Sequence, residues 1–198
     1  SSGKVTFDDV NFTDGQYFTL ASQQAAPGAV ASNLHLWLKA DAQTFSDAGS
    51  TASTDGTEVQ EWHDQSGNNF DADDSGGNGP DWDADGINFN PTLDFTGGAS
   101  GEPLDIPNGI MEGGTKTHMY VYSVVTTDIL HTQALFWQDL NTSNTTEVFS
   151  FIPHWNNGSS YWDNGYANGR AGPAASGITL GQPHLFSLSS TTNSMEIK

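Results

Sequence analysis

Short stretches of this chain alternate hydrophobic and polar residues with period two. Leu34, Leu36 and Leu38 are separated by single residues of other types, which is typical of a β-strand with two unlike faces. Gly, Asn, Asp and Ser fill the connections, as they do in turns. Helical spacing of apolar residues is confined to one turn at 128–135. The pattern predicts an all-β chain, with a strand at 34–40 and further strands at 58–63, 87–89, 92–95, 118–126, 134–138, 148–152, 160–163 and 184–190.

The spacing of these strands indicates the architecture. Strands at intervals of about ten residues are typical of sandwiches and barrels, and at 198 residues they predict a two-sheet antiparallel jelly-roll sandwich. We expect three parts along the chain. They are 1–21, an N-terminal β element with strands at 4–7 and 16–20 or the tail of a preceding module; 22–33, a linker; and 34–198, the jelly roll.

The end of the jelly roll is the second strand of an expected hairpin. Residues 185–188 and 194–197 have the pattern of two strands, and Lys198 follows directly. Because a domain seldom stops with unpaired strand backbone, we expect the jelly roll to be truncated at its C-terminus.

Charge and composition exclude several classes of partner. Five Lys and Arg stand against 24 Asp and Glu, for a net charge of −19. Nucleic acids and anionic membranes need a cationic face, so neither is an expected partner. No apolar run approaches the ~18 residues of a membrane span, and we expect no membrane insertion. The chain has no Cys, which excludes disulfides, thiolate nucleophiles and Cys-ligated metals.

The acidic residues are concentrated in one region. Residues 41–94 contain eleven Asp and two Glu without one Lys or Arg. Asp81, Asp83 and Asp85 alternate and are followed by glycine, which matches the start of a calcium loop. The twelfth loop position holds threonine in place of glutamate, so the loop is not an EF-hand. A solvated acidic loop is the alternative interpretation.

A second calcium candidate precedes the first. It consists of Asp64, Asp71 and Asp73. Asp64 also has a structural alternative, because an Asp before Ser66-Gly67 can accept hydrogen bonds from the turn that follows it. Both interpretations stay open on the sequence.

Aromatic and polar residues alternate between 155 and 170. Aromatic faces stack on the C–H patches of sugars, while amides, carboxylates and arginine bind the hydroxyls. Tyr161 and Trp162 are adjacent in an expected strand and therefore point to opposite faces, so only one of them can face a ligand. If Trp162 is a core residue, the site shifts to Tyr161 with Asp163. The candidate glycan-binding residues are Trp155, Tyr161, Trp162, Asp163, Asn164 and Arg170.

Several motifs resemble one family of modules. The chain from 34 to 198 is similar to the laminin-G-like, concanavalin-A-like jelly rolls of very large secreted bacterial surface proteins, adhesins among them. The resemblance implies a two-sheet sandwich, often with bound calcium and a role in carbohydrate recognition, beside neighbouring modules of a longer chain. The motifs are LWLKAD (36–41), WHDQSGN (62–68), INFNPTLDF (87–95), YWDNG (161–165) and PHLFSL (183–188).

Catalytic alternatives lack their motifs. Endoglucanases of this fold use E-x-D-x-x-E, and the run Glu61 to Asp64 has no second Glu. Lyases of the fold need a cationic groove, whereas this chain has one Arg and an acidic field. Composition leaves a serine triad open, but G-x-S-x-G is absent. The six His include no H-x-x-x-H pair, so no zinc site is expected.

The sequence therefore predicts a noncatalytic, calcium-binding adhesion module that recognises a neutral glycan of a polysaccharide or glycoprotein. We expect it to be extracellular, in a secreted or cell-surface protein. The alternative is a structural spacer that binds only calcium, and a polysaccharide hydrolase or lyase is the third interpretation.

Overall fold

In the computed structural model nearly all of the regular secondary structure is β-strand. It describes residues 26–29, 31–95, 102–107, 110, 119–124, 136–139, 148–155, 157–164, 170–175, 179, 181–191 and 194–198. Within these residues the only helix is the 3-10 turn η1 (Pro27–Ala29), and no described helix is long and apolar enough to cross a membrane. The all-β prediction is confirmed. The strands are β1 (Thr44–Phe45), β2 (Thr57–Glu58), β3 (Glu61–Trp62), β4 (Ala72–Asp73), β5 (Asp81–Ile87), β6 (Asn90–Asp94), β7 (Met119–Val124), β8 (Phe136–Asp139), β9 (Val148–Ile152), β10 (Ser159–Asn164), β11 (Arg170–Ala175), β12 (Pro183–Thr191) and β13 (Ser194–Ile197).

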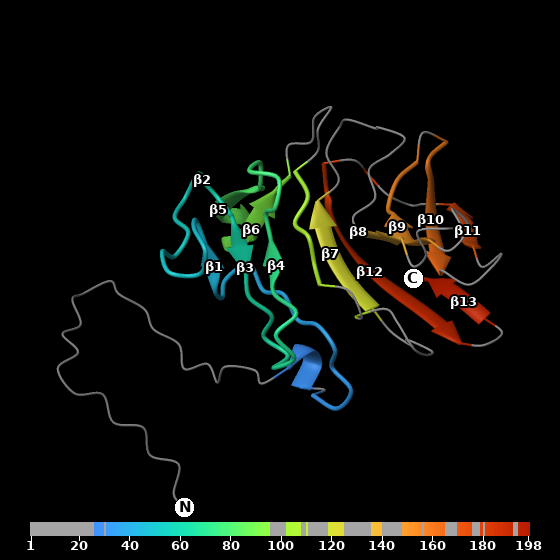
Figure 1. The fold of residues 1–198 in the computed structure, drawn as a ribbon. Helices are drawn as coiled ribbons and strands as arrows, with labels where there is room; N and C mark the ends of the chain where they lie inside the picture. The colour runs from blue at the N-terminus through green and yellow to red at the C-terminus, as the bar shows by residue number, and fades with distance from the viewer. Residues whose placement is uncertain are drawn as a thin grey trace, which may run out of the picture.

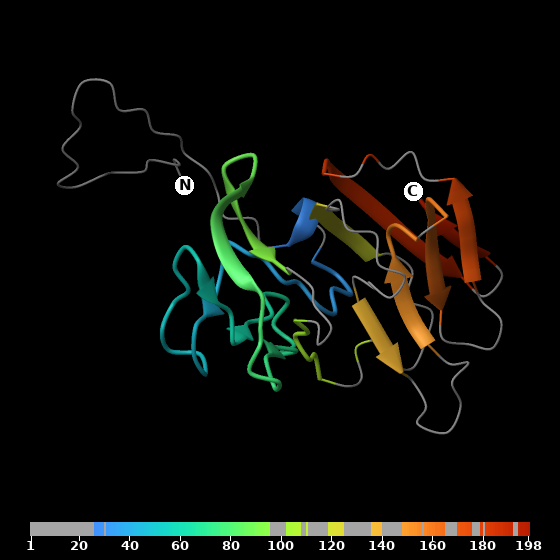
Figure 2. The same ribbon diagram turned by 90° about the horizontal axis from the view of Figure 1, so that it is seen from above.

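Two antiparallel sheets form the C-terminal half (Figure 1). One has the strand order β11-β10-β9-β8 and the other β13-β12-β7. The two sheets lie next to each other (Figure 2). Phe151 of β9 meets Phe186 of β12 edge to face, with ring centroids 4.9 Å apart, so the two sheets share a core. Trp162 and Leu188 are also fully buried. Burying such large side chains is the main stabilising contribution in this half.

Two smaller antiparallel sheets form the N-terminal half. Their strand orders are β1-β3-β4 and β2-β5-β6. The expected strand at 58–63 is in fact two strands, because the chain passes from one sheet to the other between β2 and β3. The amide of Val59 donates to Pro80 O, just before β5, whereas that of Gln60 donates to Phe45 O in β1. One sequence run therefore belongs to both sheets.

The strand expected at 34–40 does not form. Among the described residues the segment has no ladder partner, and its backbone is bonded by Gln65 N, which donates to Trp37 O, and by side chains. Asp64 accepts from Trp37 N, and the Trp62 and Trp82 indoles donate to the carbonyls at 39 and 40. Alternation alone predicted a strand here, but side chains satisfy the backbone groups that a neighbouring strand would otherwise bond.

The strand expected at 92–95 overlaps β6, whereas the one expected at 87–89 falls on the end of β5 and the turn after it. The structure has a β5–β6 hairpin whose turn is Asn88-Phe89, with φ values of 51° and 61°. Two positive φ values are typical of the type I′ turn, which usually holds Asn-Gly. Phe89 is 91% exposed at this tip.

The strands expected in the C-terminal half agree better with the structure. Residues 118–126, 148–152, 160–163 and 184–190 correspond to β7, β9, β10 and β12, and the hairpin strand at 194–197 is β13. The expected strand at 134–138 overlaps β8. The strands at 4–7 and 16–20 and the turn at 128–135 lie outside the described residues.

Candidate functional site

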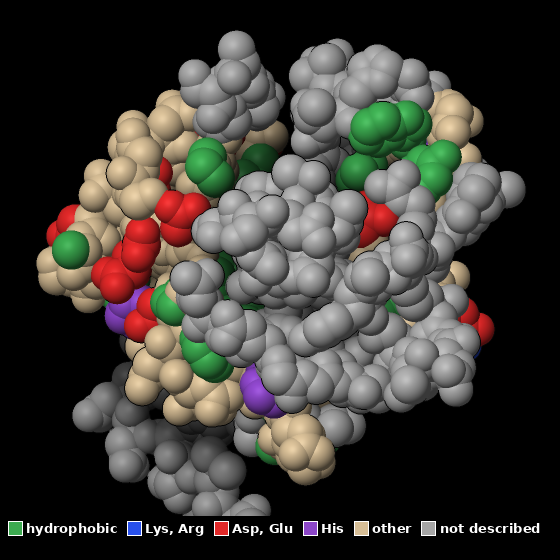
Figure 3. Space-filling model, turned by 45° about the vertical axis from the view of Figure 1, so that its right-hand side comes forward, with side chains coloured by type: hydrophobic (Ala, Val, Ile, Leu, Met, Phe, Trp, Pro, Cys, Tyr) green, Lys and Arg blue, Asp and Glu red, His purple; other side chains and the backbone are tan. Residues whose placement is uncertain are grey.

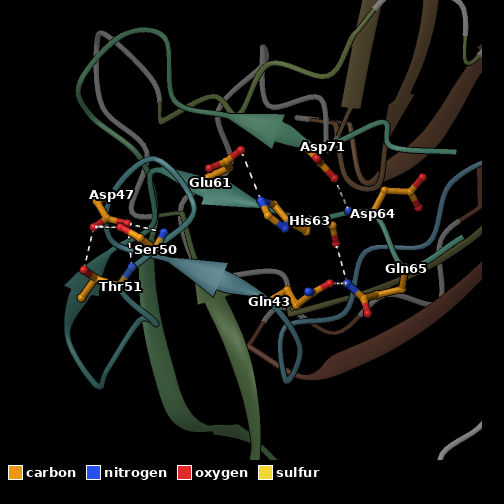
Figure 4. Close-up of polar contacts among 9 residues, drawn as sticks. All are labelled: Gln43, Asp47, Ser50, Thr51, Glu61, His63, Asp64, Gln65 and Asp71. Atoms are coloured by element: carbon orange, nitrogen blue, oxygen red, sulfur yellow. Dashed lines mark hydrogen bonds and ion pairs between the residues drawn. The ribbon is translucent and has the colours of Figure 1, made fainter. Parts of the chain in front are cut away.

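One carboxylate organises the loop that follows β1. Asp47 accepts four hydrogen bonds of 2.6–2.8 Å, two from backbone amides and two from side-chain hydroxyls of Ser50 and Thr51 (Figure 4). The Thr51 side-chain bond lowers the pKa of Asp47 most, followed by the amides of Thr51 and Ser50 and the Ser50 hydroxyl. The Asp47 carboxylate bonds amide and hydroxyl donors of the loop, and these bonds hold the loop in one conformation.

Gly49 brings this loop close to β3. Its φ of +81° is in the left-handed region. A Cβ at this position would lie 2.7 Å from Glu61 Oε2 and 3.3 Å from His63 Nε2. Only glycine tolerates both the conformation and the approach. The loop backbone therefore lies directly against two potential metal-ligating groups.

Glu61, His63 and Asp71 form the one group of three potential ligands found within the described part of the chain. One donor atom from each lies within 4.8 Å of the other two. Antiparallel pairing explains their convergence, because Trp62 stands opposite Ala72 and the same register places Asp71 opposite His63. Glu61 and His63 are two residues apart and so share a face. The His63 Nε2 to Glu61 Oε1 distance is 3.3 Å.

Neighbouring groups hold the three side chains in position. The amide of Asp64 donates to Asp71 Oδ1 at 2.8 Å (Figure 4). The Phe45 ring lies 4.7 Å from the imidazole of His63, and the side chain of Gln65 donates to His63 O at 3.0 Å. These contacts fix the backbone and the orientation of the ligands.

Asp64 itself has a structural role. It is 8% exposed, and its carboxylate points away from His63 (Figure 4). It accepts from the amide and hydroxyl of Ser66, from Trp37 N and from Phe70 N. Burial raises its pKa, but the Ser66 bonds and the two other amides outweigh burial and lower the pKa overall. The structural alternative predicted for Asp64 is confirmed.

The predicted calcium residues are arranged differently from a loop. Asp81, Asp83 and Asp85 lie in strand β5, where alternation places Asp81 and Asp83 on one face, whereas a register shift between Asp83 and Ile87 interrupts the alternation at Asp85. Asp81 pairs with Asp94 of β6, and Asp83 Oδ1 accepts from Asp85 N at 2.9 Å. The alternation of these Asp residues in the sequence belongs to a β-strand and not to a calcium loop, because β5 pairs with β2 on one side and with β6 on the other.

The second calcium set is divided in the structure. Asp71 joins the Glu61–His63 pair, whereas Asp64 faces the turn that follows it. Asp73 is exposed and pairs with Glu61 across β3 and β4, and its backbone bridges to Asp105.

The candidate glycan residues are divided between the core and one hairpin. Trp162 is 1% exposed and pairs with Phe151, so it belongs to the core. Trp155 and Tyr161 are half-buried and meet edge to face, with centroids 6.1 Å apart. Asp163 is half-buried and accepts from the hydroxyl of Ser150 at 3.2 Å. The backbone of Arg170 pairs with Asp163, while the side chains of Asn164 and Arg170 lie outside the described residues.

The charge of the three-ligand group favours a cation. Two carboxylates within 5 Å repel by roughly 3 kcal/mol at an effective dielectric constant of about 20. The ion pairs of the described Lys residues go elsewhere, Lys39 to Asp41 and Lys198 to Glu196. Figure 3 shows several acidic side chains gathered on one part of the surface, with histidine nearby.

Glu61 and His63 were absent from the sites predicted from sequence. The available signal was two short runs with a potential metal ligand at every second position, E-x-H at 61–63 and D-x-D at 71–73. The absence of an H-x-x-x-H pair excludes only a zinc site with two histidines one helical turn apart. On neighbouring strands, ligands come together at spacings of two residues.

No protein family, curated protein or solved structure matches this chain. The interpretation of the site therefore depends on its own geometry and on the sequence motifs.

Proposed function

We propose that this chain is a noncatalytic adhesion module of a secreted or cell-surface protein that binds a neutral glycan, in the manner of laminin-G-like jelly rolls. The observation that carries the proposal is the pair Trp155 and Tyr161, which is held at the end of the β9–β10 hairpin. The two facing antiparallel sheets of the C-terminal half support a jelly-roll sandwich.

The hairpin orients the aromatic pair. Trp155 N donates to Ser159 O, and Gly158 N donates to Trp155 O, both at 2.8 Å. The Asn157 amide group donates to the Tyr161 hydroxyl at 2.7 Å, and its Oδ1 accepts from Ser159 N. Ring positions fixed before binding reduce the entropy lost when a sugar stacks.

Alternation separates the binding face from the core. Because Trp162 faces inward, Tyr161 and Asp163 are on the opposite face of β10. A tyrosine ring beside a carboxylate offers a stacking surface and a hydroxyl acceptor, the two elements that a neutral sugar needs.

Calcium is the proposed cofactor of the module. Its candidate ligands are the carboxylates of Asp81, Asp83 and Asp85 in β5, with Asp94 across from Asp81. Binding to the folded form alone raises stability by about 2.7 kcal/mol when calcium is a hundredfold above its dissociation constant. Thermal melts in calcium and in chelator measure this shift, and coincident melts would favour a solvated acidic strand.

A glycan array probed with the whole chain, with and without chelator, tests the function. We expect neutral glycans to be retained, and Trp155→Ala and Tyr161→Ala to abolish retention with little change in melting temperature. Phe89→Ala is the matched control, because it removes an exposed aromatic ring from the other half of the chain. Equal retention by all variants would contradict the proposed site. Folded protein that retains no glycan would favour the structural spacer.

A further inference from the structure

We propose that Glu61, His63 and Asp71 bind a divalent cation of the first transition series, with Zn²⁺ as the reference ion. The set offers one imidazole nitrogen and two carboxylates, contributed by β3 and the segments beside β3 and β4. This site is separate from the carboxylates of β5 and from the aromatic hairpin.

The nitrogen donor decides the class of metal. Calcium and magnesium take oxygen ligands, whereas imidazole combined with carboxylates suits zinc and its neighbours in the series. A site built for calcium would gain nothing from His63. The presence of an imidazole among the three donors therefore favours zinc over calcium here.

The distances agree with this choice. Zinc bonds to nitrogen and oxygen of about 2.0–2.1 Å place two tetrahedral ligands about 3.3 Å apart. The His63 Nε2 to Glu61 Oε1 distance is 3.3 Å, and a donor atom of Asp71 lies within 4.8 Å of both residues. A small rotation of the Asp71 side chain would complete three ligands, leaving a fourth position for water.

Gly49 keeps space at the donor atoms. Any Cβ there would lie 2.7 Å from Glu61 Oε2 and 3.3 Å from His63 Nε2, filling the volume beside both groups. The hydrogen bond from Asp64 N to Asp71 Oδ1 and the Phe45 ring against His63 orient the ligands, as outer contacts do in metal sites.

Zinc titration of the whole chain, followed by calorimetry and native mass spectrometry, tests the site. We expect one zinc ion per chain that a hundredfold excess of calcium does not displace. Glu61→Gln, His63→Gln and Asp71→Asn should each weaken binding tenfold or more. His184→Gln and Glu196→Gln are the controls, because they remove a histidine and an exposed carboxylate elsewhere and should leave the affinity unchanged.

Equal zinc affinity in His63→Gln and His184→Gln would overturn the proposal, since zinc would then be bound by the many acidic residues in general and not by His63. Circular dichroism of each metal-free variant checks that it is folded. Gly49→Ala retains all three donors and should weaken zinc binding by occupying the space beside them. Zinc binding and glycan retention are measured separately, so failure of one leaves the other standing.

Discussion

Asp64 offers the sharpest test of how this half of the chain is held together. Its carboxylate joins three segments, because Oδ1 accepts from Trp37 N at 2.9 Å and Ser66 N at 2.8 Å, while Oδ2 accepts from the Ser66 hydroxyl and Phe70 N. Asp64→Ala removes every acceptor. Asp64→Asn keeps one oxygen but loses the charge and presents an NH₂ group to the Phe70 amide.

The expected loss follows from these bonds. Hydrogen bonds to a charged group contribute about 1.5–3 kcal/mol each. The two short amide bonds to Trp37 and Ser66 therefore account for about 3–6 kcal/mol, and partial access of water favours the lower value. We expect Asp64→Ala to lower the free energy of unfolding by about 3 kcal/mol, and Asp64→Asn by about 1–2 kcal/mol. These are large fractions of a typical total of ~5–15 kcal/mol.

Urea unfolding followed by tryptophan fluorescence and circular dichroism measures these losses. Asp94→Asn is the control, because Asp94 is exposed at the end of β6. If both Asp64 variants unfold at the same urea concentration as the control, the three-segment role of this carboxylate is refuted.

The pH dependence gives a second measurement on Asp64. Its pKa in the folded chain is below the ordinary value of 3.8. A lowered folded pKa means that the stabilisation is complete above the unfolded pKa and is lost as pH falls below it. The stability difference between the wild type and Asp64→Asn should be constant from about pH 7 to 5 and should shrink below about pH 4. A difference that grows in acid would contradict this sign.

Three further variants test the core, a close contact and a strained turn. Trp162→Ala should cost ~3–5 kcal/mol in thermal or urea unfolding, because the side chain is 1% exposed, and a neutral result would remove it from the core. Gly79→Ala should cost ~1–3 kcal/mol, since its Cβ would lie only 2.2 Å from the backbone oxygen of Val59, whereas Gly76→Ala, with 3.5 Å to its nearest atom, should cost less. Phe89→Gly should stabilise the chain by up to ~1 kcal/mol, because φ is 61°, and a loss of stability would mean that the ring makes a contact of its own.

The sequence predicted strands well where one face is buried. Along β10 and β12, alternation reflects true inward and outward positions, with Ser160, Trp162, Phe186 and Leu188 buried, whereas in β9 the adjacent Ser150 and Phe151 are both buried. At 34–40 Leu34, Leu36 and Leu38 are all half-buried, but among the described residues no strand pairs with this segment. A pattern of period two indicates which residues are exposed, but it does not indicate that another strand is present to form hydrogen bonds with the segment.

The candidate metal group was hidden for a topological reason. Asp71 meets His63 only because β3 and β4 pair in one particular register, and no local pattern specifies that pairing. The contact of Gly49 with Glu61 also depends on where the loop after β1 lies. By contrast, the local role of Asp64 toward Ser66 could be predicted, since it involves residues only two positions apart.

The two organising carboxylates differ in when they can act during folding. The four bonds of Asp47 reach three or four residues along the chain, whereas Asp64 reaches Trp37 across 27 residues. Closing the longer loop costs about 1.7 kcal/mol more chain entropy by the (3/2)RT ln n rule. The loop after β1, which Asp47 holds, can therefore close first and bring Gly49 into its conformation before the strands assemble. Removing Asp47 should slow folding, whereas removing Asp64 should mainly accelerate unfolding.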